Sequence, residues 1–139
     1  MAEFELDARL AADCHPLGRL GHCRLLLADV AEVPWLILVP ESGATELIDL
    51  PAPLQRELSD HAATLSELLR RRLGVDKINV AAIGNVVRQL HLHVVGRYHD
   101  DYCWPGVVWG ASGATPRSPD QVRALADLLR EELGERLRD

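Results

Sequence analysis

One long amphipathic segment, residues 53–74, restricts most strongly what this chain can fold into. Its leucines recur with the helical repeat and would form one stripe on a helix, and Gly74 is a natural helix stop. The stripe consists of Leu54, Leu58, Leu65, Leu68, Leu69 and Leu73. Such a helix exposes an apolar face, which another layer of the fold has to cover.

Short apolar runs lie in pairs on both sides of this helix. Before it, CRLLLADV (23–30) and PWLILVP (34–40) predict two strands, and the short connection between them favours an antiparallel hairpin. After it, KINVAAIG (77–84) and QLHLHVV (89–95) predict two more strands. Paired strands around one inserted long helix favour an α+β fold over a doubly wound parallel sheet.

The C-terminal part predicts a loop followed by a closing helix. Residues 102–120 are rich in Gly, Pro and Ser, which is typical of an ordered loop. Ser118 can cap the helix that follows, and Pro119 suits its first position. The apolar stripe of this helix consists of Val122, Leu125, Leu128, Leu129 and Leu133.

Length, charge and cysteine content exclude several classes of protein. A chain of 139 residues suits one compact domain, and a net charge of −6 argues against a general nucleic-acid binder. The N-terminus has no basic region followed by an apolar stretch, so no signal peptide is expected, and WLILV is far too short to cross a bilayer. Cys14, Cys23 and Cys103 form an odd, sparse set that indicates reduced thiols, so we expect a cytoplasmic protein.

Polar and apolar side chains alternate along QLHLHVV. On a strand, the apolar set would enter the core and the polar set would share the opposite face. The first set is Leu90, Leu92 and Val94, and the second is Gln89, His91 and His93.

Three interpretations fit this alternation. The first is a half-exposed strand with two surface histidines, since period-two patterns are common. The second is a metal site, because His-x-His is a frequent ligand pair, but only His99 and residues 100–101 offer further ligands nearby. The third is catalysis. A neutral imidazole can attack phosphorus and form a covalent intermediate, while neighbouring donors hold the phosphate oxygens.

In its context, QLHLHVV resembles the histidine triad motif, His-φ-His-φ-His-φ-φ with φ apolar, with glutamine in place of the first histidine. That motif belongs to the HIT family of nucleotide hydrolases and transferases. The resemblance covers roughly Cys23 to Gly110, where LLLADV, PWLILVP, ELIDL, the helix, KINVAAIGN and QLHLHVV follow the family's order. WPGVVWG is similar to a segment of a bacterial branch described as diadenosine tetraphosphate hydrolase-like.

The resemblance implies both a fold and a set of site residues. The fold is a small antiparallel sheet with two helices, in a single HIT-like domain over residues 1–139 that usually pairs as a homodimer. His91 matches the family's nucleophile, His93 the histidine that orients the phosphate, and Gln89 a supporting position. The substrate-binding positions implied are Asp29 for the ribose hydroxyls, Asn79, Gly84 and Asn85.

The activity implied is hydrolysis of a nucleoside phosphoanhydride, such as diadenosine tetraphosphate, through a nucleotidyl intermediate on His91. The ligand is a small nucleotide; the motif requires no cofactor, although a divalent cation can enter with the substrate. Gln89 departs from the motif, and Val86 stands where many relatives carry Ser or Thr near the leaving group. These departures leave open a nucleotide-binding module with little turnover and a phosphoramidate hydrolase.

Leu25 and Leu27 either line a base pocket or belong to the core. Arg88 and Arg97 flank the predicted strand and are either solvated or positioned to hold a polyphosphate. Trp104 and Trp109 either anchor their loop by packing or approach the nucleotide or a dimer partner. These alternatives cannot be separated by spacing alone.

The remaining metal-binding side chains match no standard zinc pattern. The candidates are Cys14, His15, His22 and Cys23, and the chain has no CxxC pair to support them. His61 lies within the predicted long helix, where we expect a structural role. No metal site is therefore expected.

Overall fold

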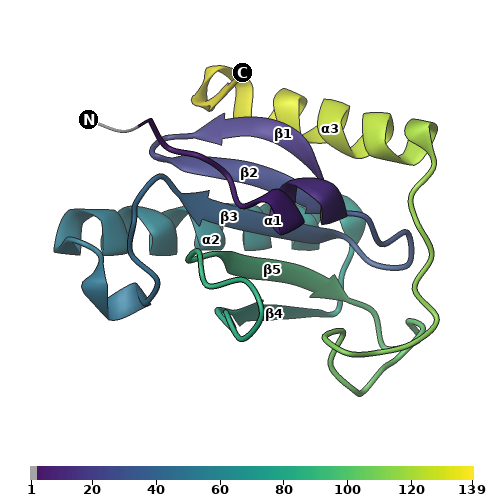
Figure 1. The fold of residues 1–139 in the computed structure, drawn as a ribbon. Coiled ribbons are helices and arrows are strands. Elements are labelled where there is room, and N and C mark those ends of the chain that lie inside the picture. The colour runs from purple at the N-terminus through teal and green to yellow at the C-terminus, as the bar shows by residue number, and fades with distance from the viewer. Residues whose placement is uncertain (1–2) are drawn as a thin grey trace.

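The computed structural model describes residues 3–139 and shows a six-stranded sheet with helices packed on it (Figure 1). The strands are β1 (Cys14–Leu20), β2 (Cys23–Ala28), β3 (Trp35–Pro40), β4 (Lys77–Ala81), β5 (Leu92–Arg97) and β6 (Leu137–Arg138). The helices are α1 (Ala8–Asp13), α2 (Ala52–Leu73) and α3 (Pro119–Leu133), with short 3-10 turns η1 (Leu47–Asp49) and η2 (Gly134–Arg136). The strand order is β4-β5-β3-β2-β1-β6, and all pairings are antiparallel, which confirms the predicted α+β class.

The elements with strong sequence signals form as predicted. β2 and β3 make the expected antiparallel hairpin. α2 ends at Gly74, whose φ of 63° is left-handed and whose N–H donates to the carbonyl of Arg70. α3 begins after Ser118, whose side chain accepts from the N–H of Gln121 in a reciprocal capping box.

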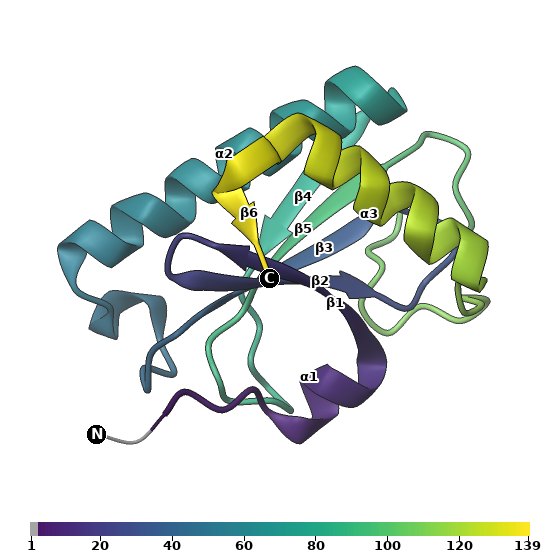
Figure 2. The same ribbon diagram turned by 90° about the horizontal axis from the view of Figure 1, so that it is seen from above.

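Helices α2 and α3 cover one face of the sheet, while α1 and a loop between β4 and β5 lie over the other (Figure 2). The main core lies under α2 and α3 and buries most of the two predicted leucine stripes. Along β2, alternation sends Cys23, Leu25 and Leu27 into this core and Leu26 and Ala28 toward α1. Leu25 and Leu27 are thus core residues under the helices, and the suggestion that they line a base pocket is wrong.

The sequence did not predict α1 or β1, so the fold has one helix more than expected. β1 contains Pro16 and Gly18, which normally interrupt a strand, and its register with β2 shifts between them. Gly18 is required there, because an added Cβ would lie 2.4 Å from the carbonyl oxygen of Arg138 in β6. α1 has six residues, too few for a periodic signal, and is capped by the side chain of Asp7.

QLHLHVV forms a strand only in its second half. β5 begins at Leu92, and the three residues before it are irregular. Leu90, Leu92 and Val94 nevertheless pack in the main core, as the alternation predicts. His91 and His93 therefore face away from the helices, toward the α1 side of the sheet, where they line a pocket together with residues of α1.

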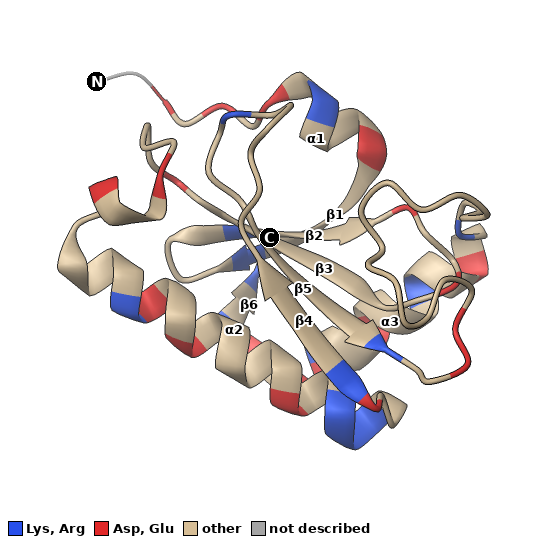
Figure 3. Cartoon of the chain, turned by 90° about the horizontal axis from the view of Figure 1, so that it is seen from below, with Lys and Arg blue, Asp and Glu red and all other residues tan. Residues whose placement is uncertain are grey.

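Acidic residues occupy the middle of α2, and basic residues gather in its last turn at Arg70, Arg71 and Arg72 (Figure 3). At its C-terminal end, Arg71 and Arg72 form ion pairs with Glu132 of α3, with Arg71 Nη2 2.7 Å from Glu132 Oε2. These pairs tie the ends of the two covering helices together. Within residues 3–139, none of the helices combines the length and apolarity that a membrane crossing requires.

Candidate active site

A pocket of about 690 Å³ lies on the α1 side of the sheet, where β2, β3 and β5 meet α1 and three loops. Five of the site residues expected from the sequence line it: Asp29, Gly84, Asn85, His91 and His93. They come from two separate parts of the chain, the end of β2 and the segment 84–93, which the sheet order brings together.

The ring of His91 is held in one tautomer. Its Nδ1 lies 2.7 Å from the main-chain carbonyl oxygen of Gln89. A carbonyl oxygen only accepts, so Nδ1 carries the proton and donates it. In the neutral ring, Nε2 then keeps its lone pair, which is the form that a nucleophilic imidazole needs.

His93 is held in the opposite tautomer. The indole N–H of Trp35 donates to its Nδ1 over 2.9 Å, so the proton of the neutral ring sits on Nε2. Burial, together with the charge that neighbouring His91 can carry, lowers the pKa of His93 to about 4. The ring centroids of the two histidines are 4.9 Å apart. The pair therefore offers a lone pair on one ring and an N–H donor on the other.

We predict that His93 stays neutral between pH 5 and 8. Its pKa of about 4 lies below that window, whereas an ordinary histidine titrates near 6.5. Because the folded-state pKa is lowered, the stability linked to the neutral ring is complete above about pH 6.5 and is lost as pH falls toward 4. Ring nitrogen NMR, assigned with His93→Gln, should show opposite tautomers for His91 and His93. A His93 signal that titrates near pH 6.5 would contradict the prediction.

Asp29, at the end of β2, is fixed by His15 and Arg117, neither of which the sequence pattern placed at this site. Its Oδ1 accepts from Nε2 of His15 at 2.8 Å and from the backbone N–H of Arg117 at 2.9 Å. These hydrogen bonds, chiefly that from His15, lower the pKa of Asp29. Both contacts use Oδ1, which leaves Oδ2 for a ligand. His15 and Arg117 lie far from Asp29 in sequence, so no local pattern marks them.

Residues 82–91 form the loop that carries Gly84, Asn85 and Val86 into the pocket lining. Gly84 has a left-handed φ of 69°, which suits glycine and turns the chain here. Asn85 is exposed, and the side chain of Val86 is 69% exposed. The loop therefore presents a carboxamide and an apolar side chain to a ligand.

The side chain of Gln89 points away from this pocket. Its Oε1 accepts from the N–H of Asp7 at 2.8 Å, and its Nε2 donates to the carbonyl of Glu5 at 2.9 Å. The amide thus ties the N-terminal segment to the loop. Gln89 supports the site through its main-chain carbonyl, which holds His91, and its side chain is not part of the pocket lining.

The arginine at the site is Arg9, and neither Arg88 nor Arg97, the two considered from the sequence, lines the pocket. Arg9 of α1 lines the pocket, whereas Arg88 is exposed outside it. Arg97 is only 1% exposed, and its guanidinium makes two hydrogen bonds to Asp101, at 2.8 and 3.0 Å. Asn79 accepts from the same guanidinium at 3.0 Å. Arg97 is therefore the centre of a structural cluster with Asp101 and the half-buried Asn79, and neither Arg97 nor Asn79 lines the pocket.

The two loop tryptophans have different roles. Trp109 lines the pocket, with its ring centroid 5.3 Å from that of His93 and 5.9 Å from that of Trp35. Trp104 packs against Arg97, whose guanidinium carbon lies 5.3 Å from its ring centroid. The alternatives left open by the sequence are thus divided: Trp109 lies at the site, and Trp104 anchors the loop.

The four residues first considered for zinc do not come together. In the β1–β2 hairpin, Cys14 is paired with Ala28 at one end and Cys23 with Leu20 at the other. His15, next to Cys14, and His22, next to Cys23, are therefore separated in the same way. His15 instead contacts Asp29. That four-residue set cannot bind a single ion.

A family model for the HIT domain matches residues 9–100. Similar solved structures include histidine triad proteins from Marinobacter aquaeolei (43% identity, covering 95% of this chain and 97% of that one), Sinorhizobium meliloti (40%, covering 94% and 97%) and Bradyrhizobium japonicum (34%, covering 94% and 98%). Each has a TM-score of 0.90. No curated protein matches. The matched domain spans most of the chain and contains the histidine pair, Asp29 and the loop before His91; the chain belongs to the HIT family.

Proposed function

We propose that this protein hydrolyses a nucleoside phosphoanhydride, in particular a dinucleoside polyphosphate such as diadenosine tetraphosphate. The observation that carries the proposal is the opposite tautomers of the two pocket histidines. His91 keeps a lone pair on Nε2, and His93 keeps a proton on Nε2. An attacking nitrogen beside a hydrogen-bond donor is the arrangement that nucleophilic attack on a phosphoryl group requires.

The reaction proceeds in two displacements. Nε2 of His91 attacks the phosphorus of a nucleoside phosphate, a P–N bond forms, and the anhydride P–O bond breaks with release of the other phosphate group. The Nε2–H of His93 donates a hydrogen bond to an oxygen of the phosphoryl group that is being transferred. Water then attacks the same phosphorus and loses a proton to solvent. The P–N bond breaks, its electron pair returns to Nε2 of His91 as the lone pair of the neutral ring, and the nucleoside phosphate leaves.

The remaining lining residues suit the rest of such a substrate. The carboxylate of Asp29 can accept from the ribose hydroxyls through Oδ2, since Oδ1 is already occupied. The guanidinium of Arg9 can stabilise the negative charge of the departing phosphate. A divalent cation that enters with the polyphosphate would neutralise further charge.

A substrate panel tests this proposal directly. The full chain should convert diadenosine tetraphosphate into mononucleotide products, identified by chromatography and mass spectrometry. An adenylated protein, heavier by one nucleotidyl group and labelled at His91, should be trapped by rapid quench into alkaline denaturant, because the P–N bond to histidine is stable in base and is hydrolysed in acid. Turnover of the panel without any such adduct would remove the covalent mechanism.

The leaving group gives a second expectation, at Val86. An amine leaving group must be protonated as it departs, whereas a phosphate, with a pKa of about 6, departs as an anion. Val86 lines the pocket and cannot deliver a proton. We predict that the wild type cleaves a dinucleoside polyphosphate faster than an adenosine phosphoramidate. We also predict that Val86→Ser raises kcat/KM for the phosphoramidate more than it raises kcat/KM for the polyphosphate. Val86→Ala serves as the size control. A wild type that prefers the phosphoramidate would contradict this assignment.

A nucleotide-binding module with little turnover is the second candidate. It is favoured by Gln89, whose side chain is engaged with the N-terminal segment, so the pocket has two imidazoles where the motif provides three. Calorimetry with AMP distinguishes the two functions. Tight binding without turnover of any member of the substrate panel would support the binding module.

We also propose that the protein is a cytoplasmic homodimer. The three cysteines are free, as expected of a reducing compartment. β4 lies at one edge of the sheet and exposes Val80, and such an edge is suited to pairing about a two-fold axis. Light scattering at working concentration should give twice the chain mass, and a monomer mass would refute the dimer.

A further inference from the structure

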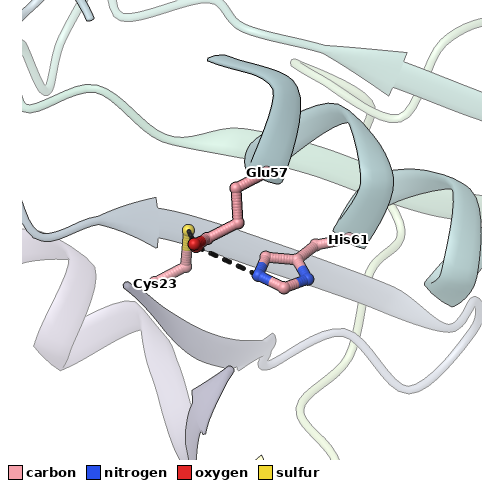
Figure 4. Close-up of side chains that lie close together, drawn as sticks. All are labelled: Cys23, Glu57 and His61. Atoms are coloured by element: carbon pink, nitrogen blue, oxygen red, sulfur yellow. Dashed lines mark hydrogen bonds and ion pairs between the residues drawn. The ribbon is translucent and has the colours of Figure 1, made fainter. Parts of the chain in front are cut away.

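Three side chains of types that can bind a metal ion lie together on the helix-covered face of the sheet (Figure 4). This face is opposite to the one that carries the histidine pocket. They are Cys23 at the start of β2, and Glu57 and His61 on α2. Their ligand atoms all lie within 4.8 Å of one another. Sγ of Cys23 is 4.0 Å from Oε2 of Glu57, and Nε2 of His61 is 3.2 Å from the same oxygen. We propose that these three residues bind a divalent transition-metal ion of the zinc class.

The chemistry of the three donors favours this class of ion. A thiolate, an imidazole and a carboxylate are the ligand types that zinc takes, whereas calcium and magnesium take oxygen ligands. Bonds of about 2.0–2.3 Å in a tetrahedral site hold the ligand atoms about 3.3–3.8 Å apart. Small side-chain movements would therefore close the present arrangement around an ion.

The positions of the donors follow from the secondary structure. Glu57 and His61 are four residues apart on α2, so they share one face of the helix. Alternation along β2 points Cys23 toward the same core that α2 covers. The three residues come from β2 and α2, which are far apart in sequence, so no local spacing predicts the site.

Two neighbouring residues complete the surroundings of the site. The ring Nδ1 of His22 lies 2.7 Å from Oε1 of Glu57, and the N–H of His22 donates to Oε2 at 2.9 Å, so the carboxylate is oriented by an outer partner. An added Cβ on Gly21 would lie 2.8 Å from Oε2 of Glu57 and 2.9 Å from Nε2 of His61. Glycine, with φ of 58°, thus keeps this space open.

A cavity adjoins the proposed site on the side of His61. It has a volume of about 310 Å³ and is lined by Gly21, His61 and Arg136 among others. Three protein ligands leave one tetrahedral position, which water can fill from this cavity. The alternative without an ion is a hydrogen-bonded tie, in which Glu57 joins the β1–β2 hairpin to α2 through His22 and His61.

Cobalt binding separates these two interpretations. The full chain, stripped with chelator, is titrated with Co²⁺, and a thiolate-to-cobalt charge-transfer band should appear and saturate at one equivalent. The band should vanish in Cys23→Ser and persist in Cys14→Ser, the matched thiol control. Zn²⁺ should displace the Co²⁺ and abolish the band.

Competition with a zinc-sensitive dye then measures the dissociation constant. Glu57→Gln and His61→Gln should weaken Zn²⁺ binding by more than about 100-fold, and His22→Ala by about 10–100-fold, as expected for an outer partner. His99→Ala, at an exposed histidine, should leave the affinity unchanged. If circular dichroism shows that Cys23→Ser does not fold, the test rests on the cobalt band of the wild type and on the Zn²⁺ affinity of His61→Gln. Absence of a thiolate–cobalt band in the wild type, or equal affinities for His61→Gln and His99→Ala, would overturn the proposal.

Discussion

Replacement of His91 by alanine is expected to lower kcat for diadenosine tetraphosphate by at least about 10⁴-fold, within the range found when a catalytic nucleophile is removed. The loss follows from the site geometry, because Nε2 of His91 is the lone-pair nitrogen of the pair and His93 presents a proton instead. KM should change much less, since Asp29, Arg9 and the loop at Gly84 remain in the pocket lining. Steady-state kinetics with quantified products measure both constants.

His99→Ala is the matched control for this experiment. The His99 side chain is 67% exposed and lies outside the pocket lining, so its removal should leave kcat within about twofold. Circular dichroism should show that both variants fold. A folded His91→Ala protein with wild-type activity would exclude His91 as the nucleophile.

Removal of one partner from the Arg97–Asp101 pair is expected to destabilise the protein by about 3–5 kcal/mol. Both side chains are 1% exposed, so Asp101→Asn leaves a buried guanidinium without a counter-charge, and Arg97→Met leaves a buried carboxylate. The pair also fixes the start of the loop that carries Trp109 into the pocket. Urea unfolding followed by circular dichroism measures the change in the free energy of unfolding.

A surface pair provides the comparison. Arg123 and Asp120 lie 3.3 Å apart on α3 with largely exposed side chains, and Asp120→Asn should cost less than about 1 kcal/mol. Equal effects of Asp101→Asn and Asp120→Asn on the free energy of unfolding would show that burial of the Arg97–Asp101 pair contributes nothing.

The buried pair should also make stability depend on pH. Hydrogen bonds from Arg97 hold the pKa of Asp101 at about 2. Since this pKa is lowered, the contribution of the ionised carboxylate to stability is present above about pH 4 and is lost as pH falls toward 2.

The sequence alone determined those features that depend on local periodicity and capping. The leucine stripe and Gly74 defined α2, and Ser118 with Pro119 defined the start of α3. The apolar runs located β2 to β5, and the alternation in QLHLHVV put Leu90, Leu92 and Val94 in the core. The order of these segments also pointed to the HIT family, because the family's motif lies in one continuous stretch of chain.

Only the tertiary structure decided which polar side chains share a space. Gln89 and His91 are two residues apart, yet one side chain binds the N-terminal segment and the other enters the pocket, because the chain is irregular before β5. Arg97 was buried by Asp101 and Asn79, while Arg9 entered the pocket on a helix too short to leave a periodic signal. Asp29 contacts His15 and Arg117, which are distant in the sequence. Cys23 likewise lies next to side chains of α2, more than thirty positions along the chain. A local pattern fixes the direction of a side chain relative to its own strand or helix, but its partners depend on how those elements pack.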